Sequence, residues 1–452
     1  MAPAYVQPTA PVPSSWPSGD AYLKQQEAAL PAYSYREVLA DPRLVAVIEQ
    51  ALANNQDVKK AAAQIAMARA QYRVQNAELL PQLDVGTSYR RSDSPGAAGS
   101  DSFAAQASVS GYELDLFGRL RSLSGAAQDR YFATEAAARA TRLTLVADVA
   151  DAWLAHAADS SLLTLARQTA ATARESVRLT QRRLDGGVAP RSDLRQAQIV
   201  LQTAEADIAA QTNAVAQDRN ALDLLVGAPV DPTHLSSAIE DAGARLAEVP
   251  AGLDSSVLLR RPDVIEAEWQ LQAANAQIGA ARAALFPRIS LTSILGFASG
   301  ALGSLFSQGS FAWQAGGGAS YSIFSGGAAR AGVAYSEAQR DAALADYRKA
   351  IQSAFADVAN TLARRGTIEP QLRAVEAGRA AAADNAHLAD LRYRGGVSSY
   401  LESLTARLSL YAADRSLANT RRLRASNLVA LYRALGGDPL AAMPDTAPDA
   451  AH

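Results

Sequence analysis

Residues 328–391 read AARAGVAYSEAQRDAALADYRKAIQSAFADVANTLARRGTIEPQLRAVEAGRAAAADNAHLADL. This segment is rich in alanine and carries charges along its whole length. As one helix of roughly 64 residues it would be about 95 Å long, because an α-helix rises about 1.5 Å per residue. Its apolar positions recur alternately three and four residues apart: Leu344, Tyr347, Ile351, Ala354 and Val358. This spacing is typical of coiled coils and predicts a left-handed supercoil against neighbouring helices.

The composition of the 452-residue chain argues against several classes of function. Its net charge of −2 offers no basic surface for nucleic acid. The chain has no cysteine, and its four histidines are scattered, so neither thiol chemistry nor a zinc site is expected. No window of 18 apolar residues exists, which predicts no transmembrane helix. We therefore expect a protein that is not an enzyme and holds no metal or cofactor.

The chain contains an internal repeat. The sequence AELLPQLDV at 77–85 returns 206 residues later as AALFPRISL at 283–291, and Gly-Gly-Val at 186–188 returns at 395–397. Each copy predicts a helix, a β-hairpin, a long helix, a glycine turn and a medium helix.

The predicted organisation follows from this repeat. It comprises an extended N-terminal arm (1–40), repeat 1 (41–230, with a β-hairpin at 82–116 and helices at 119–184 and 192–226), a connector in an equatorial region (231–253), repeat 2 (254–437, with a β-hairpin at 288–324 and helices at 327–393 and 398–435) and a disordered tail (438–452).

The strands of both hairpins alternate apolar and polar residues with a period of two. In the second hairpin Phe311, Trp313 and Tyr321 share the apolar face. Four strands leave two edges unpaired, and closing the sheet with other copies of the chain would remove them. An apolar outer face and a polar inner face are typical of a membrane barrel. Periodicity alone also permits a small sheet packed on the chain's own helices, but both hairpins interrupt helices too long to fold back over them.

Two places should perturb the helices. Asn54 and Asn55 form an irregularity within a helix predicted from Asp41 to Leu80, and Gly366 with Pro370 predicts a kink or break in the second long helix. In the helix at 192–226, the apolar seam carries two polar residues, Gln211 and Asp218. Polar seam residues can fix the register of a coiled coil at a cost in stability.

Several segments resemble the outer-membrane factors of the TolC and OprM type, which are the exit ducts of tripartite drug-efflux systems. They include YVQPTAPVP, DPRLVAVIEQALANNQDV, ARAQYRVQNAELLP, YELDLFGRLRSL, DLRQAQ, LLRRPDVIEAEWQLQAANAQIGAARAALFPRISL and LYRALGG. The resemblance runs from Pro3 onward and is strongest to the OprM-type members. It implies a mainly α fold with a membrane β-barrel, in which three chains contribute four strands each to a twelve-stranded barrel. It also implies that the long helices form a periplasmic tunnel, with an equatorial layer where helices break.

The resemblance also implies function, location and partners. The chain would be a gated passive duct for drugs and small toxic compounds in the outer membrane of a Gram-negative bacterium. It would dock to a periplasmic adaptor and an inner-membrane pump of the RND type, and so contribute to antibiotic resistance. Lipid-bearing members carry an acylated (palmitate) cysteine just before a segment like Pro3–Pro8, so we expect the native form to carry this anchor, although this chain has no cysteine. The alternative is a soluble coiled-coil adaptor or scaffold, but adaptors have one helical hairpin and this chain predicts two.

The gate of such ducts lies at the ends of the helix pairs, just after the two Gly-Gly-Val turns. By position, the resemblance assigns Asp193 and Glu402 as the acidic residues of the aperture, Leu401 as an apolar plug and Tyr393 as a linking tyrosine. Three copies of Glu402 around a narrow axis would repel one another and favour cations or hydrated passage.

This chain departs from the family at two of these positions. Thr405 stands where the family has a second acidic residue, and Ser398 stands in place of a linking arginine. Arg195 and Arg407 are therefore candidates for other ion pairs at the aperture.

Overall fold

The computed structural model describes residues 2–13, 15–17, 34–93, 99–246 and 255–437. Its elements are α1 (Tyr35–Val38), α2 (Pro42–Asn54), α3 (Gln56–Ala77), β1 (Asp84–Ser92), β2 (Ser100–Glu113), α4 (Arg119–Asp185), α5 (Arg191–Val226), η1 (Pro232–His234), α6 (Ile239–Ala244), η2 (Ser255–Arg260), α7 (Pro262–Ala283), β3 (Arg288–Ser299), η3 (Leu302–Ser304), β4 (Phe311–Ser320), α8 (Ala328–Arg394) and α9 (Tyr400–Ala434). The predicted tail, 438–452, lies outside the described residues, as do parts of the predicted arm and connector.

The chain divides into two compact units. The sheet unit comprises Met1–Ala10, Ala62–Ala136 and Ile265–Ala350, and the helical unit comprises Pro11–Ala61, Ala137–Val264 and Ile351–His452. Each unit is described by itself below.

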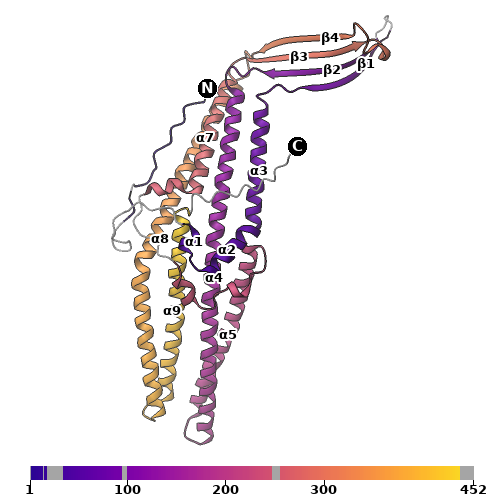
Figure 1. Ribbon diagram of the computed structural model, residues 1–452. Helices are drawn as coiled ribbons and strands as arrows, with labels where there is room; N and C mark the ends of the chain where they lie inside the picture. Colours follow the sequence, from indigo (N-terminus) through magenta and orange to yellow (C-terminus); the bar gives the residue numbers. More distant parts are fainter. Residues whose placement is uncertain (1, 14, 18–33, 94–98, 247–254, 438–452) are drawn as a thin grey trace. The chain divides into compact units, whose positions relative to one another are not determined.

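The sheet unit holds one antiparallel sheet with the strand order β1-β2-β3-β4 (Figure 1). Its register places Val85, Ala107, Leu295 and Trp313 in one row across the four strands. Residues that face each other across a ladder share a face, and so do residues two apart along a strand. This apolar face therefore carries aromatic residues from every strand: Tyr89, Phe103, Phe297, Phe311 and Trp313. The opposite face carries Asp84, Ser108, Ile294 and Gln314 in its corresponding row, of which three are polar.

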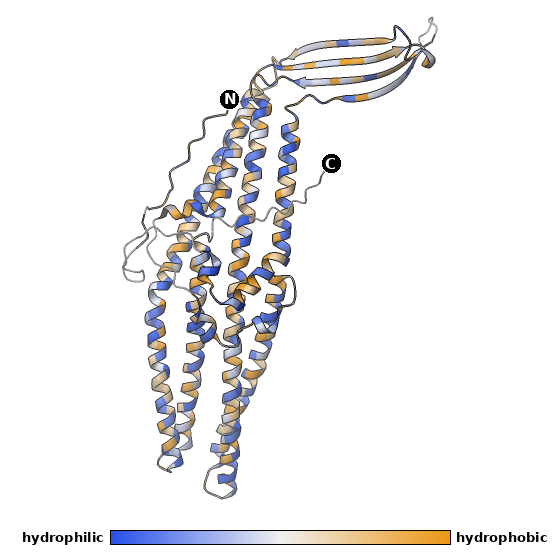
Figure 2. Ribbon diagram, viewed as in Figure 1, coloured by the Kyte–Doolittle hydropathy of each residue, from blue (hydrophilic) through white to orange (hydrophobic). Residues whose placement is uncertain are grey.

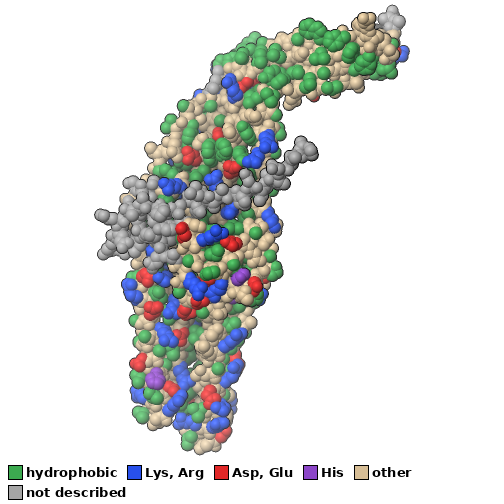
Figure 3. Space-filling view, viewed as in Figure 1, with side chains coloured by type: hydrophobic (Ala, Val, Ile, Leu, Met, Phe, Trp, Pro, Cys, Tyr) green, Lys and Arg blue, Asp and Glu red, His purple; other side chains and the backbone are tan. Residues whose placement is uncertain are grey.

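The apolar face is exposed. Phe311 is 55% and Trp313 is 73% solvent-accessible, and hydrophobic side chains gather over the sheet in Figure 3. The alternative of a sheet packed against the chain's own helices is therefore not what the fold shows for these residues. Tyr321, which we predicted on the same strand, lies one residue beyond the end of β4.

The start of the chain is held against α7 within the sheet unit. The Tyr5 hydroxyl donates to Glu268 at 3.2 Å, and Asn275 donates to the carbonyl of Pro3 at 2.8 Å. A Cβ at Gly279 would lie 2.7 Å from the backbone nitrogen of Ala2, so glycine is what lets the arm approach the helix. In the helical unit, Trp16 stacks on Phe355 with ring centroids 4.8 Å apart.

Three sequence predictions about helix boundaries need correction. The segment 1–40 is not extended throughout, because Ser34 and Glu37 form a capping box that starts α1. Asn55 ends α2, and its side chain starts α3 by accepting hydrogen bonds from the backbone of Asp57 and Val58. The irregularity is thus a full helix break. Conversely, α8 runs unbroken through Pro370, because one proline removes a single backbone hydrogen bond and the flanking turns keep theirs.

The break at Asn55 is tied to the end of α5. Asn55 donates to the carbonyl of Leu225 at 2.8 Å. Gly227, with φ of 73°, ends α5 where a Cβ would lie 2.8 Å from the carbonyl oxygen of Asn54. Gly227 is needed here for two reasons: its backbone is left-handed, and the backbone of Asn54 lies too close for a side chain. The left-handed glycine ends α5.

Hydrophilic and hydrophobic residues are interspersed along every long helix (Figure 2). Among the described residues, no helix has both the length and the apolar character to span a membrane.

The polar seam residue Asp218 lies in α5 opposite Asp159 of α4. Burial raises the pKa of the Asp218 carboxyl, the negative charge of Asp159 adds to this shift and Arg422 opposes it, and together they bring the pKa to about 6. The folded protein therefore holds an extra proton here between the ordinary aspartate pKa of about 4 and pH 6.

We expect this proton to make stability depend on pH. Because the folded state binds the proton more tightly than the unfolded state, the contribution of Asp218 to stability is greatest below about pH 4 and falls as pH rises to about 6. Asp218→Asn should abolish that part of the fall and raise the thermal midpoint at pH 7.5 by a few degrees. The measurement is thermal unfolding by circular dichroism at several pH values, with Glu205→Gln on the same helix as control. An Asp218→Asn variant with an unchanged pH profile would contradict the prediction.

Candidate functional site at the tips of the helical hairpins

Two turns of the same geometry join the helices at the tips. Gly187 has φ of 73° between α4 and α5, and Gly396 has φ of 74° between α8 and α9. Val188 donates its backbone N–H to the carbonyl of Arg183 at 2.9 Å, and Val397 donates to Arg392 at 2.9 Å. These are the contacts of a Schellman motif, which ends a helix on a left-handed glycine. The structure confirms both predicted turns.

A buried aromatic cluster fastens the two hairpins to each other. Tyr393 of α8 and Tyr400 of α9 pack with Ala197 of α5 and Leu404 of α9, and Val177 of α4 lies against this cluster. The two tyrosine rings are 5.3 Å apart. The guanidinium of Arg183, on α4, lies 4.9 Å from the centre of the Tyr393 ring, which is within the range of a cation–π contact. All four helices therefore meet at this cluster.

Arg407 of α9 makes polar contacts with both neighbouring helices. It forms an ion pair with Asp390 of α8 and donates to the Ser176 hydroxyl of α4 at 3.1 Å. Asp390 also pairs with Arg394 at 2.8 Å. The contact with Ser176 crosses from one hairpin to the other, so we call Arg407, Asp390 and Ser176 the tip latch.

Tyr400 contacts the tip latch through a hydrogen bond with Ser176. Burial raises the pKa of its phenol above the ordinary value, whereas a hydrogen bond with Ser176 and the charge of Arg407 lower it. The net shift is upward, so Tyr400 stays neutral at physiological pH and can share Ser176 with Arg407 without adding a charge.

The other predicted residues have different surroundings. Glu402 lies in the first turn of α9, whose N-cap is Ser399, and pairs with Arg392 at 3.3 Å. Asp193 is half-buried in the first turn of α5, 3.5 Å from the Ser192 hydroxyl.

Three further candidates lie at the tips. Arg195 donates to the side-chain amide oxygen of Gln198 at 2.8 Å, and its ion pair at the aperture stays a prediction. Leu401 is 54% exposed, and Thr405 is exposed on the same helix. Charged side chains of both signs surround these tips in Figure 3.

A second link joins the hairpins farther from the turns. The Tyr411 hydroxyl of α9 donates to Asp207 of α5 at 2.7 Å, and Arg415 approaches the same carboxylate at 3.5 Å. Burial and the hydrogen bond to Asp207 together raise the pKa of Tyr411 to about 12.

Sequence reasoning missed Ser176, Asp390, Tyr400 and the Tyr411–Asp207 link. No local motif marks them, because each partner lies on another helix. The available signal was position: Tyr400 lies three residues after the second turn, nearer than Asp193 lies to the first, and Asp390 lies one helical turn before Arg394.

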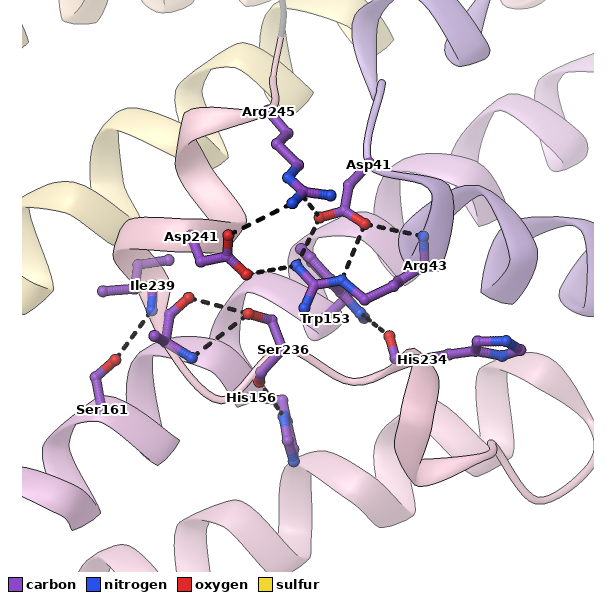
Figure 4. A network of polar contacts seen from close by, with 11 residues as sticks. Asp41, Arg43, Trp153, His156, Ser161, His234, Ser236, Ile239, Asp241 and Arg245 are labelled. Atoms are coloured by element: carbon purple, nitrogen blue, oxygen red, sulfur yellow. Dashed lines mark hydrogen bonds and ion pairs between the residues drawn. The ribbon is translucent and has the colours of Figure 1, made fainter.

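A network of polar contacts joins the middle of α4 to α2 and to the segment 234–245 (Figure 4). Asp41 is fully buried and accepts hydrogen bonds from the backbone and guanidinium of Arg43, which also pairs with Asp241 at 2.8 Å. Burial by itself would raise the pKa of Asp41, but the hydrogen bonds and charge of Arg43 outweigh it and hold this pKa below its ordinary value. Trp153 donates to the carbonyl of His234 at 2.9 Å. This network ties the start of α2 to α4 and α6.

A cavity of about 380 Å³ lies between α4, α8 and α9 near the start of α7. Among its charged lining residues, Arg261 contacts Asp263 at 2.8 Å and Asp357 at 3.3 Å. Arg433 approaches Asp148, which lies outside the lining, at 3.5 Å.

Comparison with known proteins places these features in context. The profile of the family described as outer membrane efflux protein matches residues 47–228 and 253–437. The solvent efflux pump outer membrane protein SrpC of Pseudomonas putida is 42% identical, covering 97% of this chain and 95% of the relative. The outer membrane protein OprJ of Pseudomonas aeruginosa is 37% identical, covering 97% and 92%.

A solved structure agrees with the fold. The open state of the MtrE outer membrane channel of Neisseria gonorrhoeae superposes with a TM-score of 0.88 at 34% identity, covering 97% of this chain and 98% of that chain. These matches confirm the predicted fold class and do not favour the alternative of a soluble adaptor.

Proposed function

This chain belongs to the outer membrane efflux protein family, and from that premise we propose that three copies assemble into a gated exit duct of a tripartite efflux system. The chain is an outer-membrane efflux channel. What we propose beyond this is its assembly, its gate, its partners and the compounds that pass through it.

The proposal for assembly rests on the sheet. Among the described residues, β1 and β4 each pair along one side only, and the apolar face that includes Phe311 and Trp313 is exposed. Pairing β4 of one copy with β1 of the next would satisfy both edges. A closed barrel would then turn the apolar face to lipid and the polar face to the lumen. We infer that Phe311, Trp313 and Tyr321 face the membrane.

The proposal for the gate rests on the contacts at the tips of the hairpins. The aromatic cluster, the tip latch and the Tyr411–Asp207 link all hold the α8–α9 hairpin against the α4–α5 hairpin. Separating the hairpins would widen a passage between copies, so breaking these contacts would open the duct. Conduction is passive, because no bond to the transported compound is made or broken. Asp193 and Glu402 would set the charge of the opening.

Partners and cargo follow from the relatives. The relatives named for solvent, toluene and antibiotic efflux pumps suggest small, toxic, largely apolar compounds as cargo. We propose a periplasmic adaptor and an inner-membrane RND pump as partners.

The proposal is tested with purified protein. We expect a complex that requires detergent, has the mass of a trimer after mild heating, and conducts ions across a planar lipid bilayer. A monomer that remains in solution without detergent and conducts no ions would refute it.

We expect removal of the acidic residues to change conductance at the aperture. Asp193→Ala together with Glu402→Ala should raise the single-channel conductance, because the narrow opening loses charged side chains and Arg392 loses its partner Glu402. Cation selectivity should fall at the same time. Planar-bilayer recordings of both single variants and the double variant give the measurement, and unchanged conductance in all three would remove these residues from the aperture.

A further inference from the structure

The loop between β3 and β4, residues 300–310, differs in chemistry from the loop between β1 and β2. No charged residue occurs between Arg288, the first residue of β3, and Arg330, so the second hairpin is uncharged beyond its first residue. The end of the first hairpin, in contrast, is charged: Arg91 approaches Asp93 at 3.6 Å and Asp101 at 3.9 Å. An ordinary surface loop has little reason to avoid charge.

The loop folds back over the apolar face of the sheet. The ring of Phe306 contacts the ring of Phe297 edge-on at 5.3 Å, and Phe297 contacts Phe311 at 5.7 Å. Phe297 belongs to the apolar face through its register with Phe311. The loop therefore does not lie over the polar face, where it could cover a lumen.

Register also gives the level of Phe306 along the strands. Phe297 lies opposite Ala105 of β2, four residues from Asp101. At about 3.3 Å per residue this is roughly 13 Å inward from the charged end of the first hairpin. The Phe306 ring contacts Phe297 at that depth. Phe306 is 72% exposed and Leu302 is 66% exposed.

Serine hydroxyls donate to four of the loop's carbonyl groups. Ser304 donates to the carbonyl of Ala301 at 3.0 Å, Ser307 to that of Ser304 at 2.7 Å, and Ser310 to those of Leu305 and Ser307 at 2.6 and 2.8 Å. Irregular backbone is tolerated in a nonpolar environment only when its polar groups find partners nearby. Serine hydroxyls provide those partners here, which water would otherwise provide.

We propose that this loop is a membrane anchor, inserting Phe306 and Leu302 among the acyl chains of the outer leaflet. The proposal rests on the proposed function, in which the apolar face of the sheet meets lipid. The occupant is lipid because the loop continues that face, lacks charge and leaves large apolar side chains exposed. The two hairpins would then differ in role: the first reaches the aqueous surface and the second ends within the membrane.

Because this chain has no cysteine, single cysteines can be introduced for a direct test. Single-cysteine variants Phe306→Cys and Leu302→Cys are labelled with an environment-sensitive fluorophore and reconstituted into vesicles that contain lipids with brominated acyl chains. Trp313→Cys reports on the sheet face itself, and Asp93→Cys reports on the charged end of the first hairpin. We expect labels at 302, 306 and 313 to lose most of their emission to the brominated chains, and the label at 93 to lose little.

Each other outcome decides between the two proposals. If the label at 313 is quenched while those at 302 and 306 behave like the label at 93, the loop is aqueous and the anchor is refuted, but the barrel stands. If labels at 302 and 306 are shielded from both lipid and aqueous quenchers, the loop contacts another copy of the chain and the anchor is again refuted. If the label at 313 is not quenched, the barrel orientation fails and the anchor fails with it.

Discussion

Replacing Arg407 with alanine is expected to increase the open population of the duct by about tenfold. Arg407 is the one member of the tip latch that contacts both α8 and α4. A hydrogen bond to a charged group contributes about 1.5–3 kcal/mol. Because the Arg407 side chain is 32% exposed, we reduce this to about 1–2 kcal/mol. A change of about 1.4 kcal/mol shifts an equilibrium tenfold.

The measurement is open probability in planar bilayers, supported by the entry of a large antibiotic into cells that produce the variant. Arg379→Ala is the matched control, since Arg379 pairs with Asp414 at 2.7 Å within a single hairpin. It removes the same charge but no contact between hairpins, so it should leave opening unchanged. Asp390 keeps Arg394 as a partner in the Arg407 variant, which limits damage to the fold. Equal effects of the two variants would show that the tip latch does not hold the hairpins together.

Replacing Asp41 with alanine is expected to destabilise the helical unit by about 3–4 kcal/mol. Breaking a buried ion pair by removing one partner costs about 3–5 kcal/mol, and Asp41 is fully buried beside Arg43. The loss stays toward the low end because Arg43 retains Asp241. Asp41 also caps α2, and loss of an N-cap costs about 1 kcal/mol.

Two further variants separate charge from capping. Asp41→Asn keeps an N-cap side chain and removes only the charge, so it should destabilise less than alanine does. Asp241→Ala removes a carboxylate that is 48% exposed, for which we expect about 0–1 kcal/mol. Chemical denaturation followed by circular dichroism measures all three. If Asp241→Ala costs as much as Asp41→Ala, burial of Asp41 is not what makes the network stabilising.

Acidification should act in the same direction as Asp41→Asn. The pKa of Asp41 is below its ordinary value in the folded protein. Its contribution to stability is therefore present above the unfolded pKa of about 4, and is lost as pH falls through the folded value.

Features with a local cause were predictable from the sequence. The long helices follow from spacing of residues such as Tyr347 and Ile351, and the two turns follow from Gly187 and Gly396, since only a left-handed glycine ends a helix this way. The alternation in β4 correctly placed Phe311 and Trp313 on one face.

Features that depend on distant partners were not predictable. Asp41 pairs locally with Arg43, two residues away, but its burial and its contact with Arg245, at the end of α6, require that α6 lies beside α2. Arg407 was chosen because a family position was vacant, whereas its contact with Ser176 spans 231 residues. Pro370 gave a wrong prediction. A proline inside a helix predicts a kink or break, but α8 tolerates the loss of one backbone hydrogen bond.

The one-sided pairing of β1 and β4 has a consequence before assembly. A newly exported chain would expose two unpaired edge strands and an apolar surface rich in aromatic residues. Together these promote aggregation. To avoid aggregation, the chain must either bind a chaperone or assemble with other copies of itself faster than it contacts unrelated proteins. The yield of the duct in a cell would therefore be set by kinetics in the periplasm rather than by the stability of the finished complex.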